Sequence, residues 1–131
     1  MSRVVKLKYR PRSVFEDFHT RKERWAIIVA HRRAGKTCAC INDLVVRASL
    51  EGKKDARYAY IAPYHSQAKT IAWDYLLRYS APLLKKSNQS ELWVELINGA
   101  KIRLFGADNP DNLRGLYLDG VILDEYADMK P

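Results

Sequence analysis

The chain has few cysteines and no long apolar run. Cys38 and Cys40 are the only cysteines among 131 residues. Their CAC spacing matches no zinc pattern and disfavours a disulfide, so we expect buried or half-buried helix residues without chemistry. No apolar run approaches the length of a membrane span, and the basic N-terminus lacks the apolar stretch of a secretory signal. We therefore expect no membrane association and a cytoplasmic location.

Acidic residues are scarce relative to basic ones. Lys and Arg number 23 against 15 Asp and Glu, which gives a formal charge of +8. This balance favours a polyanionic partner such as nucleic acid. The basic residues are spread along the chain, however, and a solvated basic surface explains the count equally well. No repeat or low-complexity segment occurs, and the length suits one small domain or part of a larger one.

Short apolar runs predict three strands, at residues 25–30, 57–63 and 121–123. The first and last are apolar throughout, as expected of strands buried on both faces of a parallel sheet. Residues 91–106 predict a hairpin around Asn98-Gly99. A two-residue turn would place Glu95 opposite Ile102, but the side-chain pattern favours a bulged register. The bulged register pairs Trp93 with Phe105, Val94 with Leu104 and Glu95 with Arg103.

Helical spacing is found between these strands. A short helix from Ser13 would place Phe15 and Phe18 on one face. A second helix follows the first strand and ends near residue 51, and a third covers 64–80. The apolar positions of the second helix are Ile41, Leu44, Val45 and Ala48. The pattern predicts an α/β fold with a mostly parallel sheet, flanking helices and a β-hairpin insert.

Residues 30–37, AHRRAGKT, have the spacing of a P-loop with Ala30 in place of the first glycine. A loop between a strand and a helix N-terminus directs several N–H groups at one phosphate site. Gly35 allows close approach, Lys36 reaches the β- and γ-phosphates, and Thr37 offers a hydroxyl to Mg²⁺. The residues predicted to bind ATP are Ala30, His31, Arg32, Arg33, Ala34, Gly35, Lys36 and Thr37.

The last predicted strand ends in Asp124-Glu125, as in a Walker B motif. Asp124 would help Thr37 to hold Mg²⁺, and Glu125 would orient or deprotonate the attacking water. The simpler alternative is a strand followed by two solvated acids. The glutamate directly after the aspartate favours hydrolysis over transfer to a small molecule.

Four segments, VAHRRAGKT, YIAPYHSQAKTIAWDYL, NPDNLRG and GVILDEYADM, together resemble the ATPase domain of tailed-bacteriophage terminase large subunits. The resemblance implies a P-loop NTPase of the additional-strand, catalytic-glutamate type. It implies ATP hydrolysis that drives double-stranded viral DNA into a procapsid, in the cytoplasm of a bacterial host. The implied partners are the portal, the small terminase subunit and further copies of the chain in a ring. The alternatives are a helicase-type ATPase and a remnant that binds nucleotide without turnover.

The resemblance also suggests roles for single residues. Arg32 matches an arginine that contacts nucleotide phosphate or couples nucleotide state to movement, so Arg32 joins Lys36 and Glu125 as a catalytic candidate. Arg33 adds charge or lies in solvent. The candidates to flank adenine are Tyr9, Pro11, Phe15 and Phe18, although Phe15 and Phe18 also suit core packing. Gln67 and Lys69 are candidates for contacting DNA or γ-phosphate, or equally for a solvated helix face. Arg114 is a candidate for a subunit interface or a pair with Asp111 or Asp119.

The resemblance divides the chain into a nucleotide-flanking segment, 1–24, and a P-loop core through Walker B, 25–131. The whole chain then corresponds to the N-terminal portion of the ATPase domain, with no nuclease domain. We expect a fragment or truncated gene product whose sheet is incomplete, with an exposed edge, because the chain stops after Walker B. Alone, it should bind nucleotide weakly and turn over slowly or not at all.

Overall fold

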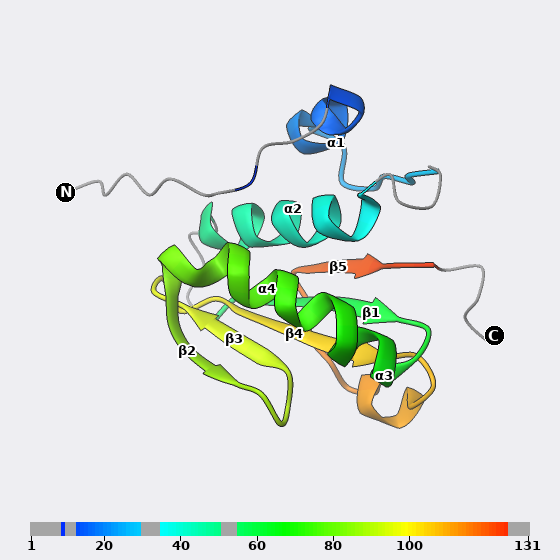
Figure 1. Ribbon diagram of the computed structural model, residues 1–131, viewed down its shortest axis with the longest axis vertical. Coiled ribbons are helices and arrows are strands. Elements are labelled where there is room, and N and C mark those ends of the chain that lie inside the picture. The colour runs from blue at the N-terminus through cyan, green and yellow to red at the C-terminus, as the bar shows by residue number, and fades with distance from the viewer. Residues whose placement is uncertain (1–8, 10–12, 30–34, 51–54, 126–131) are drawn as a thin grey trace.

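The computed structural model describes residues 9, 13–29, 35–50 and 55–125, which form a mixed α/β fold with helices flanking a five-stranded sheet (Figure 1). The strands are β1 (Arg57–Ala62), β2 (Leu84–Asn88), β3 (Trp93–Leu96), β4 (Lys101–Gly106) and β5 (Gly120–Leu123). The helices are α1 (Glu16–Thr20), α2 (Lys36–Leu50), α3 (His65–Gln67) and α4 (Trp73–Ser80), with a π-helical stretch at Ala68–Ala72 and 3-10 turns at Ser13–Phe15, Ala81–Leu83 and Pro110–Leu113. None of the described helices is long and apolar enough to cross a membrane.

The sheet has the order β2-β3-β4-β1-β5 and is mixed rather than mostly parallel. β1 pairs in parallel with both β4 and β5, whereas the β2–β3 and β3–β4 pairs are antiparallel. The strands predicted at 57–63 and 121–123 are confirmed. β2 was not predicted, because its sequence LKKSN is mostly polar and has no β-branched residue.

The predicted hairpin forms between β3 and β4, but the predicted register is wrong. Val94 lies opposite Ile102, not Leu104. The loop holds three residues, closed by a 2.8 Å hydrogen bond from Leu96 N–H to the Ala100 carbonyl, and Gly99 takes a φ of 91°. A three-residue loop of this kind needs glycine at its left-handed position. The register differs from the expected one by an even number of residues, so each side chain keeps its predicted face.

α2 and α4 lie side by side on one face of the sheet (Figure 1). The apolar stripe predicted for α2 is confirmed, because Ile41, Leu44, Val45 and Ala48 are all buried. The helix predicted over 64–80 is also confirmed, as one helical run from α3 to α4 with the π-helical stretch between them. Beneath the helices, the main core takes up the inward-facing side chains of the sheet, which include Tyr60, Val94, Leu96, Ile102 and Leu104.

The opposite face of the sheet carries no long helix among the described residues. Its small apolar cluster consists of Ala59, Ile61 and Phe105, packed by residues of the connection from β4 to β5. That connection contains only the 3-10 turn at 110–113. We call this side of the sheet the helix-free face.

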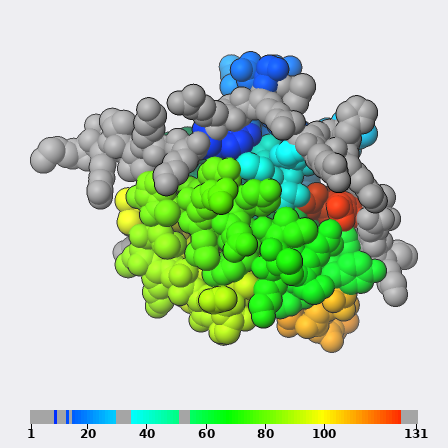
Figure 2. Space-filling view, in the orientation of Figure 1, coloured from blue at the N-terminus to red at the C-terminus, as the bar shows by residue number. Residues whose placement is uncertain are grey.

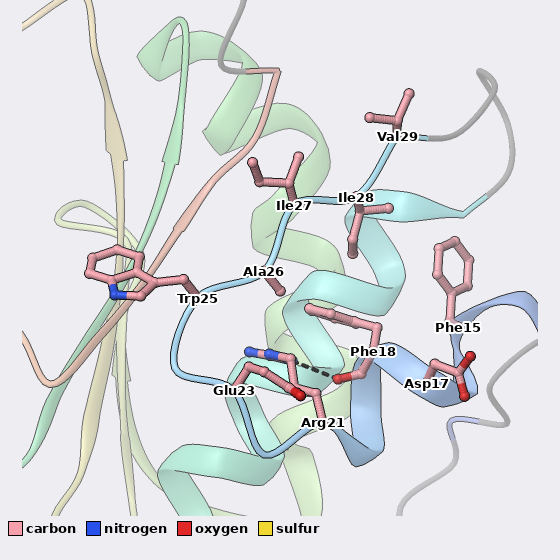
Figure 3. Close-up of a pocket in the computed structure, with 10 residues that line it drawn as sticks. All are labelled: Phe15, Asp17, Phe18, Arg21, Glu23, Trp25, Ala26, Ile27, Ile28 and Val29. Carbon is pink, nitrogen blue, oxygen red and sulfur yellow. Dashed lines mark hydrogen bonds between the residues drawn. The ribbon is translucent and has the colours of Figure 1, made fainter.

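The strand predicted at 25–30 is wrong for residues 25–29, which form no strand and lie outside the core. Trp25, Ile27 and Val29 are 78%, 93% and 93% exposed. Together with α1 the segment lines a depression of about 450 Å³ (Figure 3). The segment does not pair with β5, the last strand of the described sheet, so its apolar side chains are not covered by the core. β5 is correspondingly an edge strand, and its expected burial is also wrong, since Val121 and Leu123 are 40% and 48% exposed.

The helix predicted from Ser13 is confirmed as a 3-10 turn that continues into α1. Asp43 of α2 holds this N-terminal segment in place. The Asp43 side chain is only 4% exposed and lies 3.2 Å from His19 Nδ1, 3.2 Å from Arg21 and 2.9 Å from Arg47. A buried carboxylate needs such partners, because burying it unpaired is costly. The network fixes the N-terminal segment against the helix that begins at Lys36.

Candidate functional site

The N-terminus of α2 begins with three residues of the predicted P-loop. Gly35 has a φ of 89°, which only glycine adopts without strain. Its carbonyl accepts a 2.9 Å hydrogen bond from Ala39 N–H, so the helix starts at this turn. Lys36 and Thr37 follow in the first turn, where unpaired N–H groups and the helix dipole favour an anion. Residues 30–34 lie outside the described residues, so Ala30, His31, Arg32, Arg33 and Ala34 remain predictions.

The Asp124-Glu125 pair follows the end of β5, close to the start of α2. In the space-filling view the end of β5 lies beside α2 (Figure 2). Asp124 N–H donates a 3.0 Å hydrogen bond to the Ile61 carbonyl of β1, which fixes the backbone at this position. The Thr37 hydroxyl donates a 2.8 Å hydrogen bond to Asp124 Oδ2. The structure thus brings together the two residues predicted to hold Mg²⁺.

Tyr60 of β1 is a site residue that the sequence did not single out. Its hydroxyl donates to Asp124 Oδ2, the oxygen that also accepts from Thr37. Burial raises the pKa of Tyr60 above its ordinary value, and the neighbouring Asp124 carboxylate raises it further. The phenol therefore stays protonated and remains a donor. The sequence did offer one signal. Tyr60 lies in a predicted strand of the sheet, and a buried tyrosine hydroxyl needs a hydrogen-bond partner.

Glu125 is exposed and has a φ of 51°, a left-handed conformation that is uncommon for a residue with a side chain. Its Oε2 accepts a 2.9 Å hydrogen bond from Gln67 Nε2. Gln67 ends α3, so the segment after β1 reaches across to the acidic pair. Sequence reasoning placed Gln67 near the nucleotide or DNA, and the structure places it on the predicted catalytic carboxylate.

The oxygen donors fit a magnesium site of the kind expected. Thr37 offers a hydroxyl and Asp124 a carboxylate, and Mg²⁺ prefers oxygen ligands while keeping several waters. Oδ1 of Asp124 has no hydrogen bond within the described part of the chain. No group of three or more His, Cys, Asp or Glu side chains suited to a metal occurs there either.

The candidates to flank adenine have partners of their own within the N-terminal segment. The Tyr9 hydroxyl lies 2.9 Å from His19 Nε2, and burial raises the pKa of Tyr9 to about 12. Phe15 is buried, and the Arg21 guanidinium lies 4.3 Å from the Phe18 ring centroid. Pro11 lies outside the described residues, and contact of this segment with adenine stays a prediction.

The remaining expectations concern two charged side chains and the two cysteines. Arg114 pairs with Asp111 at 3.6 Å on the surface, one of the alternatives expected for it, and Lys69 is exposed. Cys38 is half-buried and Cys40 buried within α2, as predicted. Burial raises the pKa of Cys40 to about 12, so its thiol is neutral and inert at physiological pH.

A Gly-Lys-Thr helix start beside an Asp-Glu strand end, in an α/β sheet flanked by helices, is typical of nucleotide-hydrolysing P-loop proteins. Comparison with solved structures is more specific. The chain is similar to the large terminase ATPase domain of Thermus phage P74-26, with 26% identity and a TM-score of 0.76 over 95% of this chain. A point variant of that domain matches 91% of this chain at 25% identity and a TM-score of 0.71. The resemblance to terminase large subunits is therefore confirmed in the structure.

The chain spans little more than half the length of these two domains, 57% and 55%. No family model matches the chain, and no curated protein is significantly similar to it.

Proposed function

We propose that this chain is the ATPase part of a viral DNA-packaging motor. It binds ATP with Mg²⁺, and hydrolysis to ADP and phosphate drives double-stranded DNA into a procapsid. The observation that carries the proposal is the hydrogen bond between Thr37 and Asp124, which joins the two halves of a nucleotide site. The similarity to the phage terminase ATPase domain supports the motor assignment over a helicase.

Each site residue has a defined task in this proposal. The first-turn N–H groups of α2 and the Lys36 ammonium bind the β- and γ-phosphates. Thr37 and Asp124 hold Mg²⁺, which neutralises phosphate charge when bound. Glu125 orients the attacking water and accepts its proton. Gln67 donates to Glu125 Oε2, which leaves Oε1 available to accept the proton.

The remaining assignments follow from the resemblance and are part of the same proposal. Arg32 contacts nucleotide phosphate, and the other residues of 30–34 complete the loop around it. Duplex viral DNA is the translocated substrate, and copies of the chain act in a ring with a portal and a small terminase subunit. The site of action is the cytoplasm of an infected bacterium.

Binding and single-turnover hydrolysis of ATP by the chain test the proposal. We expect weak binding that requires Mg²⁺ and slow hydrolysis. Thr37→Ala should weaken binding in the presence of Mg²⁺ while changing Mg²⁺-free binding little, because the hydroxyl contributes through the cation. Mg²⁺-independent binding that is insensitive to Thr37→Ala would show that Thr37 and Asp124 do not form a magnesium site.

A further inference from the structure

The helix-free face of the sheet has a depression of about 480 Å³, on the side opposite α2 and α4. Strands β1, β3 and β4 form its floor, and residues 115–118 form one side. Along β4, Lys101, Arg103 and Phe105 line it, whereas the alternating Ile102 and Leu104 point into the main core. The strand alternation therefore sorts cationic and aromatic side chains onto this face.

Aromatic rings hold the cations of this face in place. Lys101 Nζ lies 4.6 Å and Lys86 Nζ 5.6 Å from the centroid of the Trp93 ring. Arg103 Cζ lies 5.0 Å from the Phe105 centroid. Such contacts orient a cation without neutralising it. They also occupy ring faces that would otherwise be open to stacking.

The cations that line this depression outnumber its carboxylates, with Arg57, Lys101 and Arg103 against Glu91. No carboxylate of the described residues forms an ion pair with Arg57, Lys101 or Arg103, and the buried Nε of Arg103 has no hydrogen-bond partner among them. Three acids lie beside them: Glu91 accepts a 2.9 Å hydrogen bond from Trp93 Nε1, Glu95 pairs with Lys85 at 3.3 Å, and Asp119 Oδ2 accepts a 2.9 Å hydrogen bond from Arg57 N–H. Three cationic side chains thus remain free to bind an anion.

We propose that the helix-free face binds the phosphate backbone of duplex DNA, an inference that rests on the proposed packaging function. Arg57, Lys101 and Arg103 contact successive phosphates of one strand, and the depression receives part of that strand's backbone. The partner is a duplex backbone rather than unstacked bases, because Lys and Arg already cover the faces of Trp93 and Phe105. Phosphate contacts carry no sequence information, so the binding is non-specific and salt-dependent.

The test measures binding of a labelled DNA duplex at several salt concentrations. The double variant Lys101→Met/Arg103→Met removes two charges while keeping apolar length against the aromatic rings. We expect at least about tenfold weaker binding at low salt. The slope of log affinity against log salt should fall by about 1.8, which is about 0.9 for each lost phosphate contact.

The matched control is Lys22→Met/Arg78→Met, which removes two exposed cations outside this face. It should retain the slope of the unmodified chain, and thermal melts should show that both double variants are folded. Arg103→Lys should keep most of the affinity, because it keeps the charge. The proposal would be overturned if both double variants lost the same duplex affinity, or if the salt slope of Lys101→Met/Arg103→Met were unchanged. Absence of duplex binding by the unmodified chain would also overturn it.

The ATP site provides an independent control. Lys101→Met/Arg103→Met should bind Mg²⁺ and ATP as the unmodified chain does, because its changes lie on the sheet face and not at the carboxyl ends of β1 and β5. If this double variant binds the duplex as tightly as the unmodified chain, and nucleotide binding is intact, only the proposed DNA surface is refuted. If ATP binding does not depend on Lys36, but the double variant still binds the duplex more weakly, the proposed ATPase is refuted instead.

Discussion

The Thr37 hydroxyl donates a 2.8 Å hydrogen bond to Asp124 Oδ2, although the two residues lie 87 positions apart. Tyr60 donates to the same oxygen from β1. One carboxylate oxygen is thus fixed by two hydroxyls from separate elements. This arrangement sets the orientation of Asp124 before any cation binds, which is the kind of preorganisation that a binding site requires.

Removing the phenol should weaken the magnesium dependence of nucleotide binding. Tyr60→Phe keeps the ring in the core but deletes one donor to Asp124, a type of bond worth about 1.5–3 kcal/mol when one partner is charged. We expect the affinity for ATP in the presence of Mg²⁺ to fall about tenfold, with little change when the cation is chelated. Equal losses under both conditions would assign Tyr60 a packing role only.

Glu125→Gln separates binding from chemistry. The glutamine can still accept the hydrogen bond of Gln67 through its side-chain oxygen, so the local geometry is kept and only the base is lost. ATP affinity should stay unchanged, while single-turnover hydrolysis by a longer, active form of the protein falls by about two decades or more. Hydrolysis at a near-normal rate would move the catalytic carboxylate elsewhere, with Asp128 the next candidate.

The buried Asp43 network should dominate the stability of the N-terminal segment. Asp43→Ala leaves His19, Arg21 and Arg47 without their shared carboxylate, and breaking a buried ion pair costs about 3–5 kcal/mol. Denaturant unfolding should show a loss of that order.

The matched control for Asp43 is Asp111→Ala, which removes a carboxylate from an ion pair whose side chains are 80% and 84% exposed. Exposed pairs contribute about 1 kcal/mol or less, so its unfolding should be nearly unchanged. Similar small losses in both variants would mean that Asp43 does not hold the segment in place.

Alkaline pH should destabilise the chain through Cys40. Burial raises the pKa of this thiol from 9.0 to about 12, so the folded chain keeps a proton that the unfolded chain releases. The contribution of this proton to the free energy of unfolding is fully present below pH 9. It falls as pH rises towards 12, by up to about 1.4 kcal/mol per pH unit. The free energy of unfolding should therefore decline above pH 9 and decline less steeply in Cys40→Ala. Parallel pH profiles would contradict this assignment.

The sequence predicted those parts of the fold that depend on local patterns. The apolar spacing of α2 and the short apolar run of β1 each mark one element, and both formed where expected. The failures depend on neighbours. Residues 25–29 have the composition of a buried strand but lack a pairing partner, and the hairpin register was set by a three-residue loop that Asn98-Gly99 alone does not specify.

The candidate site was predictable in its motifs but not in its cross-chain contacts. Lys36, Thr37, Asp124 and Glu125 stand in recognisable local sequences. Tyr60 and Gln67 do not, because their roles arise from the parallel pairing of β1 with β5 and from the path of α3 back towards the strand end. Such contacts depend on tertiary structure, and no local pattern encodes them.

The most direct test of the central claim is ATP binding by the unmodified chain and by Lys36→Ala, measured by titration calorimetry with and without Mg²⁺. In the proposed site, Lys36 at the start of α2 supplies the charge that meets the β- and γ-phosphates. We predict binding that is weak, requires Mg²⁺ and disappears in Lys36→Ala while the thermal melt of the variant is unchanged. Equal ATP affinity in the two folded proteins would contradict the assignment of this site.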